Sequence, residues 1–328
     1  MQEDYLNNLP PGSGKLLKRR QKLFPDVLSA NPAKISEFNA ADLTRKSEFK
    51  RIYRPSKKTS MENFIIPVGT GQVIGGYLFR KLGKKEDIQN SLIVYLHDGG
   101  WILGNMDICC AVCSNICDVT GATVLAIDYR LAPENKFPIP VEDCYNAYIW
   151  AAQGARYWRA DPTKIYLMGS CAGANLAAAV CHLARDRKVS MPAGLILVDP
   201  ITDCRLRTDS IEKYKDNPLL SGKQLAFFIS NYMREPKDIL DPLFSPLLAL
   251  DHSRLPETLI LAAEADPLFD DAELYAKALA SADTPCKFIE CKGRLHGMLN
   301  FPSAYHWKET MEVVTQFVNG RSVNLLNL

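Results

Sequence analysis

The sequence lacks any apolar run near the ~20 residues that a membrane span requires, so we expect no membrane-spanning segment. It also lacks an excess of either charge, because 39 Lys and Arg oppose 37 Asp and Glu and leave a net charge of +2. This balance gives no strong surface field of the kind that attracts nucleic acid or an acidic partner. Residues Met1 to Asn8 are polar and do not form the charged-then-apolar pattern of a secretion signal. We therefore expect a cytoplasmic protein that binds no nucleic acid.

Cysteine is abundant, with ten residues, yet the cysteines do not indicate a disulfide framework. Most lie within apolar strand or helix patterns, and a large chain without a secretion signal is expected to keep free thiols in a reducing compartment. Cys109, Cys110, Cys113 and Cys117 crowd one segment, and three of them are spaced to share one helix face. A continuous helix rarely wraps several thiolates around one ion, and no second Cys or His pair follows. We interpret these residues as core cysteines and expect no metal site.

The pattern of strands and helices predicts an α/β fold. A chain of 328 residues that is 47% hydrophobic suits one large α/β domain with a lid. Strand patterns at 64–68 and 73–80 are joined by a Gly-Thr-Gly turn and predict an antiparallel hairpin. From residue 92 onward, buried strands alternate with helices, which predicts a mostly parallel sheet with helices on both faces. The polar stretch at about 203–250 breaks this alternation and is interpreted as an insertion that forms part of the lid.

A short glycine-framed segment, Gly169-Ser170-Cys171-Ala172-Gly173, lies between a predicted buried strand and a predicted helix rich in Ala and Leu. Strand, tight turn and helix in this order are typical of a nucleophile elbow, in which the glycines leave room for a strained central residue. The glycine frame puts Cys171 at the nucleophile position and Ser170 one place earlier, where its side chain should point elsewhere. Taken alone, the motif fits a small-residue turn with a buried thiol equally well.

Two further residues at predicted strand ends complete a candidate catalytic triad. Cys171, Asp266 and His296 follow one another in the nucleophile, acid and base order of α/β-hydrolases. His296 would take the proton of the thiol, and Asp266 would hold the imidazole in the required tautomer. In isolation, Asp266 before Pro267 is typical of a helix N-cap, and His296 is typical of a turn. Their shared order and placement at strand ends favour the triad.

The segment His97-Asp98-Gly99-Gly100 follows a central strand and matches the oxyanion loop of lipases and esterases. Adjacent glycines let backbone N–H groups converge on a developing oxyanion without interference from side chains. The N–H of Ala172, at the start of the helix after the elbow, would add a third donor. The predicted oxyanion hole is therefore made by Gly99, Gly100 and Ala172, and the alternative is a simple Gly-Gly turn.

Together these segments resemble the hormone-sensitive-lipase-like branch of the α/β-hydrolases, which includes bacterial acetyl esterases. The resemblance is carried by residues 97–101, 128–134 (Asp-Tyr-Arg-Leu-Ala-Pro-Glu) and 169–177, and by Asp266-Pro267-Leu268 with His296-Gly297. It implies an α/β-hydrolase fold and a carboxylesterase that acts on short or medium acyl esters without a cofactor. It also implies a helical cap built from an N-terminal segment, residues 1–55, and the 203–250 insertion, over a hydrolase domain of residues 56–328.

The chain departs from the family pattern at two points. The family has Gly-Asp-Ser-Ala-Gly where this chain has Ser170 and Cys171, and His-Gly-Gly-Gly where this chain has Asp98. A thiol at a helix N-terminus beside a histidine is expected to have a lowered pKa and to be partly ionised. A larger sulfur in an elbow shaped for serine is misplaced, which predicts slow or narrow hydrolysis, a preference for activated esters or thioesters, or acyl transfer through a thioester. A carboxylate at Asp98 would oppose the charge of an oxyanion.

A second hypothesis is a ligand-binding pseudo-esterase, since the plant gibberellin receptor resembles this family and binds its ligand in the former active site. The changes at Asp98 and Cys171 favour binding, whereas the retained Asp266, His296 and oxyanion donors favour catalysis. The sequence leaves open whether Cys171 is the native residue or a substitution. We also expect the last strand, near Phe288, to offer an edge on which a homodimer can form.

Overall fold

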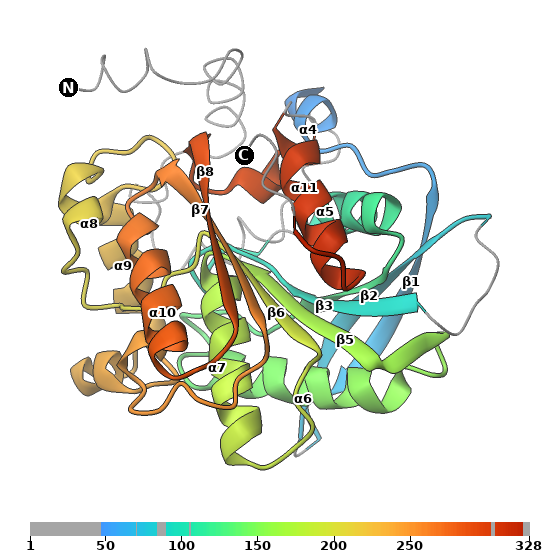
Figure 1. The fold of residues 1–328 in the computed structure, drawn as a ribbon, viewed down its shortest axis with the longest axis horizontal. Helices are drawn as coiled ribbons and strands as arrows, with labels where there is room; N and C mark the ends of the chain where they lie inside the picture. Colours follow the sequence, from blue (N-terminus) through green and yellow to red (C-terminus); the bar gives the residue numbers. More distant parts are fainter. Residues whose placement is uncertain (1–46, 70, 84–89, 105, 303–305, 324–328) are drawn as a thin grey trace.

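An eight-stranded sheet forms the centre of the molecule (Figure 1). The computed structural model describes residues 47–69, 71–83, 90–104, 106–302 and 306–323. The strand order is β1-β2-β4-β3-β5-β6-β7-β8; β1 and β2 form an antiparallel hairpin, β2 is antiparallel to β4, and the remaining pairs are parallel. The strands are β1 (Thr59–Pro67), β2 (Val73–Lys81), β3 (Asn90–Leu96), β4 (Thr123–Asp128), β5 (Ala160–Ser170), β6 (Gly194–Val198), β7 (Thr258–Ala265) and β8 (Cys286–Leu295).

Helices cover both faces of this sheet, which explains why its central strands are continuous apolar runs (Figure 1). α5 and α11 pack on one face, and α6, α7 and α10 pack on the other. This arrangement confirms the predicted mostly parallel α/β sheet with an antiparallel start. The larger helices are α5 (Met106–Thr120), α6 (Ile139–Gly154), α7 (Ala172–Asp186), α9 (Gly222–Tyr232), α10 (Phe269–Ser281) and α11 (Trp307–Val318), and the shorter ones are α4 (Ser47–Ile52) and α8 (Asp209–Lys213).

The clustered cysteines lie on α5, against the sheet. Cys109, Cys113 and Cys117 are buried in the core between α5, α11 and the sheet, and the sulfur atoms of Cys109 and Cys113 are 3.9 Å apart. All ten cysteines are free thiols. Their placement agrees with the interpretation of these residues as core cysteines on one helix face.

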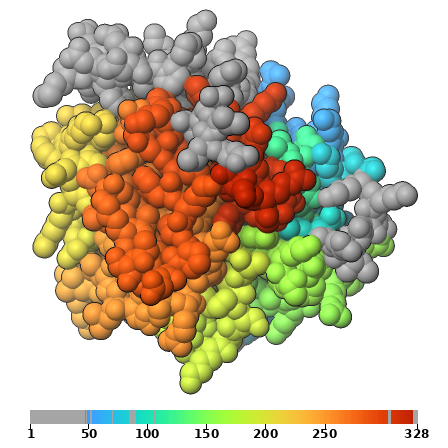
Figure 2. Space-filling model, viewed as in Figure 1, coloured from blue at the N-terminus to red at the C-terminus, as the bar shows by residue number. Residues whose placement is uncertain are grey.

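Residues 203–250 lie between β6 and β7 and contain α8, α9 and two short 3-10 helices, η3 (Pro236–Leu240) and η4 (Pro246–Leu248). Ser210 of α8 donates its backbone N–H to Asp270 of α10 at 2.7 Å, and the backbone N–H of Asp270 donates to Ser210 Oγ at 3.2 Å. Figure 2 shows the surface of α8, in yellow, beside the surface of α10, in orange. The insertion is therefore fixed to the hydrolase sheet near the loop that follows β7.

Two predictions fall partly outside the described residues. Of the predicted N-terminal cap segment, residues 1–46 lie outside them. The sequence also predicts a closing helix over 303–317; it is described as α11 from Trp307, and residues 303–305 lie outside the described residues. The last strand, β8, is at one end of the sheet order. In the part of the chain that the structure describes, no helix has the length and apolar character to cross a membrane.

Candidate active site

Cys171 stands at the turn between β5 and α7, with φ at 52° and ψ at −115°. A residue other than glycine rarely adopts this conformation, and such strain is found mainly at functional turns. A Cβ atom on Gly169 would lie 2.2 Å from the carbonyl oxygen of Gly173, and a Cβ atom on Gly173 would lie 2.1 Å from that of Leu96. Backbone packing therefore requires both glycines that frame the motif, and the predicted tight strand–turn–helix geometry is present.

Backbone hydrogen bonds fix the position of Cys171. Its N–H donates to the carbonyl oxygen of Val198, at the end of β6, at 2.9 Å. Its own carbonyl accepts from the N–H of Asn175 at 3.0 Å. The Asn175 side chain in turn donates to the carbonyl oxygens of Ile201 at 3.0 Å and Phe244 at 2.9 Å. The elbow is thus held both by the neighbouring strand and by the loops of the insertion.

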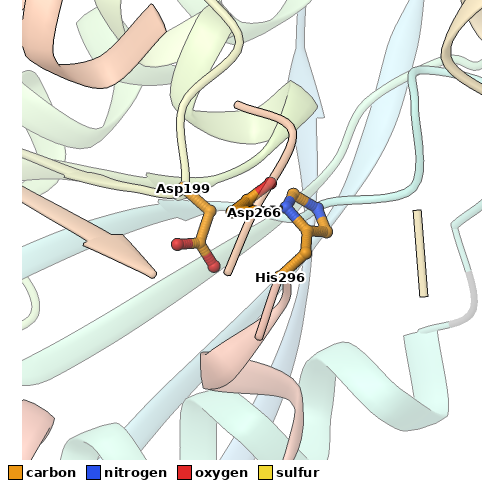
Figure 3. Close-up of side chains that lie close together, drawn as sticks. All are labelled: Asp199, Asp266 and His296. Carbon is orange, nitrogen blue, oxygen red and sulfur yellow. Dashed lines mark hydrogen bonds and ion pairs between the residues drawn. The ribbon is translucent and has the colours of Figure 1, made fainter. Parts of the chain in front are cut away.

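The structure brings Cys171, His296 and Asp266 together from the ends of three strands. The Cys171 thiol lies beside the His296 imidazole, close enough for each group to shift the pKa of the other. Nδ1 of His296 lies 2.7 Å from Oδ2 of Asp266 (Figure 3), and Oδ1 of Asp266 accepts the N–H of Leu268 at 2.9 Å. The exposed fractions of Cys171, His296 and Asp266 are 5%, 8% and 1%. The arrangement of thiol next to imidazole and imidazole next to carboxylate is the one that a nucleophile, a base and an orienting acid require.

The electrostatics of this group differ from the sequence expectation. Burial raises the pKa of the Cys171 thiol, and the charges of Asp98 and Asp266 raise it further, although the charge and hydrogen bond of His296 lower it. The prediction of a lowered thiol pKa is therefore wrong, because the loss of water around the sulfur outweighs the effect of the imidazole. Burial lowers the pKa of His296, but charge and hydrogen bonds from Asp266 and Cys171 raise it well above its ordinary value. The raised thiol pKa favours a neutral Cys171, and beside a neutral thiol it is Asp266 that makes the His296 imidazole more basic.

The three residues of the predicted oxyanion hole lie at two turns beside Cys171. Gly99 and Gly100 have φ values of 117° and 61°, in the left-handed region that favours glycine. A Cβ atom on Gly99 would lie 1.9 Å from the carbonyl oxygen of Leu103, and a Cβ atom on Gly100 would lie 2.4 Å from the ring of Phe228. Among the described residues, none accepts a hydrogen bond from the backbone N–H of Gly99, Gly100 or Ala172. These three donors are not engaged within the described fold.

Helix α9 of the insertion packs directly on this loop. Phe228 lies against Gly100, and the ring of Tyr232 stacks on that of Trp101, with centroids 4.6 Å apart and an angle of 6° between the planes. Trp101 and Tyr232 are almost completely buried. The insertion therefore covers the same end of the sheet at which Cys171, Asp266 and His296 meet.

Asp98, the departure in the oxyanion loop, has a neutral partner. Its carboxylate accepts a hydrogen bond from the Asn300 side chain. Asn300 stands four residues after His296 in the sequence. The charge of Asp98 also acts on the Cys171 sulfur, where it raises the thiol pKa. Asn300 was not predicted from the sequence, because no local pattern connects it to a residue so far away in the chain.

The Asp-Tyr-Arg segment at the end of β4, residues 128–130, contacts the start of the oxyanion loop. The ring of Tyr129 stacks on that of His97 at 4.2 Å, and the Tyr129 hydroxyl donates to the His97 carbonyl oxygen at 2.8 Å. Arg130 makes a two-point ion pair with the buried Asp143 of α6, with the shorter contact at 2.6 Å. These contacts give the segment a structural role: it fixes the start of the loop to the helix layer.

A second carboxylate, that of Asp199, lies beside Asp266 and His296 (Figure 3). No motif points to it; the available signal is an aspartate directly after a buried strand, where functional groups gather in parallel sheets. One ligand-type atom from each of the three residues lies within 4.8 Å of the other two. The two carboxylate oxygens of Asp199 already accept hydrogen bonds from the backbone N–H groups of Ala263 and Gly297. Because these N–H hydrogens carry partial positive charge and point toward the carboxylate, a cation does not fit between the three side chains. The group is a hydrogen-bonded cluster of side chains.

The comparisons with known proteins identify the class. A family model described as the alpha/beta hydrolase fold matches residues 93–300, and the chain belongs to this family, in its hormone-sensitive-lipase-like branch. It is 39% identical over 217 residues to an arylesterase of Saccharolobus solfataricus, a match that spans 65% of this chain and 70% of the relative. It is 40% identical over 215 residues to the carboxylic ester hydrolase LipN of Mycobacterium tuberculosis, which spans 64% of this chain and 57% of the relative. The hyperthermophilic esterase of Pyrobaculum calidifontis superposes with a TM-score of 0.86 at 30% identity, over 96% of this chain and 99% of that one.

Proposed function

We propose that this protein hydrolyses carboxylic esters of small molecules with short or medium acyl groups, without a cofactor. The single observation that carries the proposal is the continuous chain of contacts from the Cys171 thiol through His296 to Asp266. The relatives support the reaction type, since those described above are an arylesterase, a carboxylic ester hydrolase and an esterase. In this proposal Cys171 is the nucleophile, His296 the general base and then acid, and Asp266 the orienting group.

The proposed reaction has two stages. The Cys171 sulfur attacks the ester carbonyl while its proton passes to Nε2 of His296, and the oxyanion that forms accepts hydrogen bonds from Gly99, Gly100 and Ala172. The carbon–oxygen bond then breaks, the alcohol leaves with the proton from His296, and a thioester remains on Cys171. Water, activated by His296, hydrolyses the thioester to release the acid. An alcohol or thiol in place of water would take the acyl group, which would make the protein an acyltransferase.

The active-site cover is part of the proposal. Residues 203–250, together with residues 1–55, would form a cap over a hydrolase domain of residues 56–328, and α9 would bound the acyl or alcohol site where Phe228 packs on Gly100. Because this cap would enclose the site, we expect substrates of limited size, either esters or thioesters. The edge strand β8 can pair with a second copy of the chain, and we propose a homodimer on this edge.

A ligand-binding pseudo-esterase is the second candidate, and one observation favours it. A raised thiol pKa leaves the Cys171 sulfur un-ionised at neutral pH, which weakens it as a nucleophile. In that case the buried site would hold an ester-like or acid-like ligand without cleaving it.

Acyl transfer to Cys171 separates the two candidates. The protein is mixed with p-nitrophenyl acetate and stopped early, and the peptide that contains Cys171 is examined by mass spectrometry for an acetyl group. The hydrolase proposal expects acetylation of that peptide, release of p-nitrophenol, and loss of both in Cys171→Ala. Hydrolysis that is undiminished in Cys171→Ala would reject Cys171 as the nucleophile, and the absence of both acetylation and turnover would favour the ligand-binding protein.

A further inference from the structure

Asp199 occupies a special backbone position at the end of β6. Its φ is 46°, in the left-handed region that aspartate and asparagine adopt more readily than most residues. Its N–H donates to the carbonyl oxygen of Leu261 on β7 at 2.8 Å, and its side chain is only 1% exposed. The residue before it, Val198, accepts the N–H of Cys171. Asp199 therefore sits between the strand that supports the thiol and the strand that leads to Asp266.

Its two carboxylate oxygens bind two different parts of the site. Oδ1 accepts the backbone N–H of Ala263, on β7, at 3.0 Å. Oδ2 accepts the N–H of Gly297 at 2.9 Å and, less closely, that of Met298 at 3.4 Å. Gly297 directly follows His296. The carboxylate thus ties the strand that carries Asp266 to the turn that carries His296.

We propose that Asp199 is a positioning residue that holds the His296 turn in register with Asp266 and Cys171. This inference rests on the proposed esterase function for its catalytic consequence. The physical reason is that a carboxylate is the one side chain of this size that accepts hydrogen bonds at both ends without presenting a donor. Correct placement of a catalytic base matters because a shift of ~1 Å costs about 100-fold in rate.

The charge state of Asp199 is part of its role. Three titratable groups face it: Asp266 directly after β7, His296 directly after β8, and Cys291 on β8. Burial and the charge of Asp266 raise the pKa of Asp199, while His296 and the backbone N–H groups lower it, and together these effects bring it to about 7. Protonation would place a hydrogen on an oxygen that already accepts a backbone N–H. The bridge is therefore complete when Asp199 is ionised and weakens as the pH falls through about 7.

Asp271 provides a matched control. It is also 1% exposed, burial also raises its pKa to about 7, and it also accepts two backbone N–H groups, from Thr202 and Asp203. Both N–H groups reach the same oxygen, Oδ2, at 2.9 Å, and neither belongs to the His296 turn. An asparagine at this position can accept both bonds with its single oxygen. At Asp199 an asparagine must turn its NH₂ group against one of the N–H donors.

The test compares Asp199→Asn with Asp271→Asn by kinetics and by proton NMR. The low-field resonance of the His296 Nδ1 proton, assigned by its loss in Asp266→Asn, reports the His296–Asp266 contact without any substrate. We expect Asp199→Asn to lower kcat roughly 10- to 100-fold, with a small change in KM, and to weaken or shift this resonance. Asp271→Asn should keep the wild-type kcat and the wild-type resonance. An unchanged resonance in folded Asp199→Asn would overturn the inference, whether or not the protein hydrolyses esters.

A wild-type measurement covers the case in which Asp199→Asn does not fold. The His296 Nδ1 resonance is followed from pH 8.5 to pH 5.5 in parallel with the ¹³C shift of the Asp199 carboxyl carbon. The inference expects the resonance to change with the same midpoint as the Asp199 carboxyl. A resonance that stays constant while Asp199 takes up its proton would overturn it. Esterase activity that is absent from the wild type would reject the proposed function alone, because both NMR readouts need no turnover.

Discussion

Asn300 donates a hydrogen bond from its side chain to the carboxylate of Asp98, and so connects the loop after β3 with the turn after β8. The two residues are separated by 202 positions in the chain. Asp98 stands next to Gly99, and Asn300 stands four residues after His296. This contact fixes the carboxylate that distinguishes the oxyanion loop of this protein from the family pattern, and it leaves the negative charge close enough to influence Cys171.

Removal of the Asp98 charge should make Cys171 more reactive. In Asp98→Asn, the new side-chain oxygen can still accept from Asn300, but the charge that raises the thiol pKa is gone. We expect severalfold faster alkylation of Cys171 by iodoacetamide at pH 8, and faster esterase turnover. Asn300→Ala, which keeps the charge, is the control for changes in loop position. Equal alkylation rates in Asp98→Asn and wild type would show that this charge does not reach the sulfur.

The reactivity of Cys171 should rise towards alkaline pH. Burial raises the thiol pKa, and Asp266 holds the pKa of His296 above its ordinary value, so the neutral imidazole that the proposed general-base step needs becomes more populated as the pH rises. Thiolate forms only as the pH rises through the raised thiol pKa, and we expect alkylation and ester hydrolysis to increase from pH 7 to beyond pH 9. The rates are measured by mass spectrometry and by release of p-nitrophenol, with Cys171→Ser as the alkylation control. A plateau below pH 7 would instead indicate a preformed thiolate–imidazolium pair.

Replacement of sulfur by oxygen should improve ester hydrolysis. The elbow is closed tightly by Gly169, Gly173 and the hydrogen bond to Val198, and a smaller oxygen at position 171 would attack from a better-aligned position. We expect Cys171→Ser to increase kcat/KM for alkyl esters by roughly tenfold or more. Thioester substrates should gain less. A fall in activity towards every substrate would mean that the site is adapted to a thiol.

The contact between Gly100 and Phe228 should limit substitution in the oxyanion loop. A methyl group on Gly100 would clash with the Phe228 ring, 2.4 Å from its nearest atom, and the φ of 61° at Gly100 adds strain of about 1–2 kcal/mol. We expect Gly100→Ala to reduce kcat strongly and to lower the unfolding midpoint. Gly100→Ala combined with Phe228→Ala should recover part of the lost stability, since the ring is removed, while the backbone strain remains. If the double variant is no more stable than Gly100→Ala, the ring contact is not the cause.

Asp271 should reduce stability as the pH rises. Its pKa is about 7 in the folded protein and near 3.8 in the unfolded chain, so the folded state binds more protons between these values and the free energy of unfolding falls as the pH rises through this window. Asp271→Asn keeps an oxygen for the two N–H groups and removes the buried charge. We expect this variant to be more stable than wild type at pH 8.5, with the advantage shrinking towards pH 5. Urea denaturation at both pH values measures the difference in the free energy of unfolding between the variant and the wild type. An advantage of the variant that grows on acidification would contradict a raised pKa for Asp271.

Much of the fold follows from local patterns. The uninterrupted apolar run at Leu92–Leu96 predicts a strand covered on both faces, and β3 is buried along nearly its whole length. The closing helix predicted over 303–317 is described as α11 from Trp307 to Val318, and apolar spacing marks the buried face of such a helix better than its first residue. The order Cys171, Asp266, His296 could also be derived from strand ends, because parallel strands bring their carboxyl ends to one edge.

The sequence by itself determined which local structures are available: Gly169 and Gly173 make a tight elbow possible, and the alternation of strands and helices predicts a layered sheet. Tertiary structure alone decided the chemistry inside that frame. The thiol of Cys171 has a raised pKa because the fold removes water from it, and Asp199 reaches the turn of His296 because β6, β7 and β8 are successive neighbours in the sheet. Desolvation and long-range hydrogen bonds depend on what surrounds a residue after folding, and no local spacing of residues encodes that surrounding.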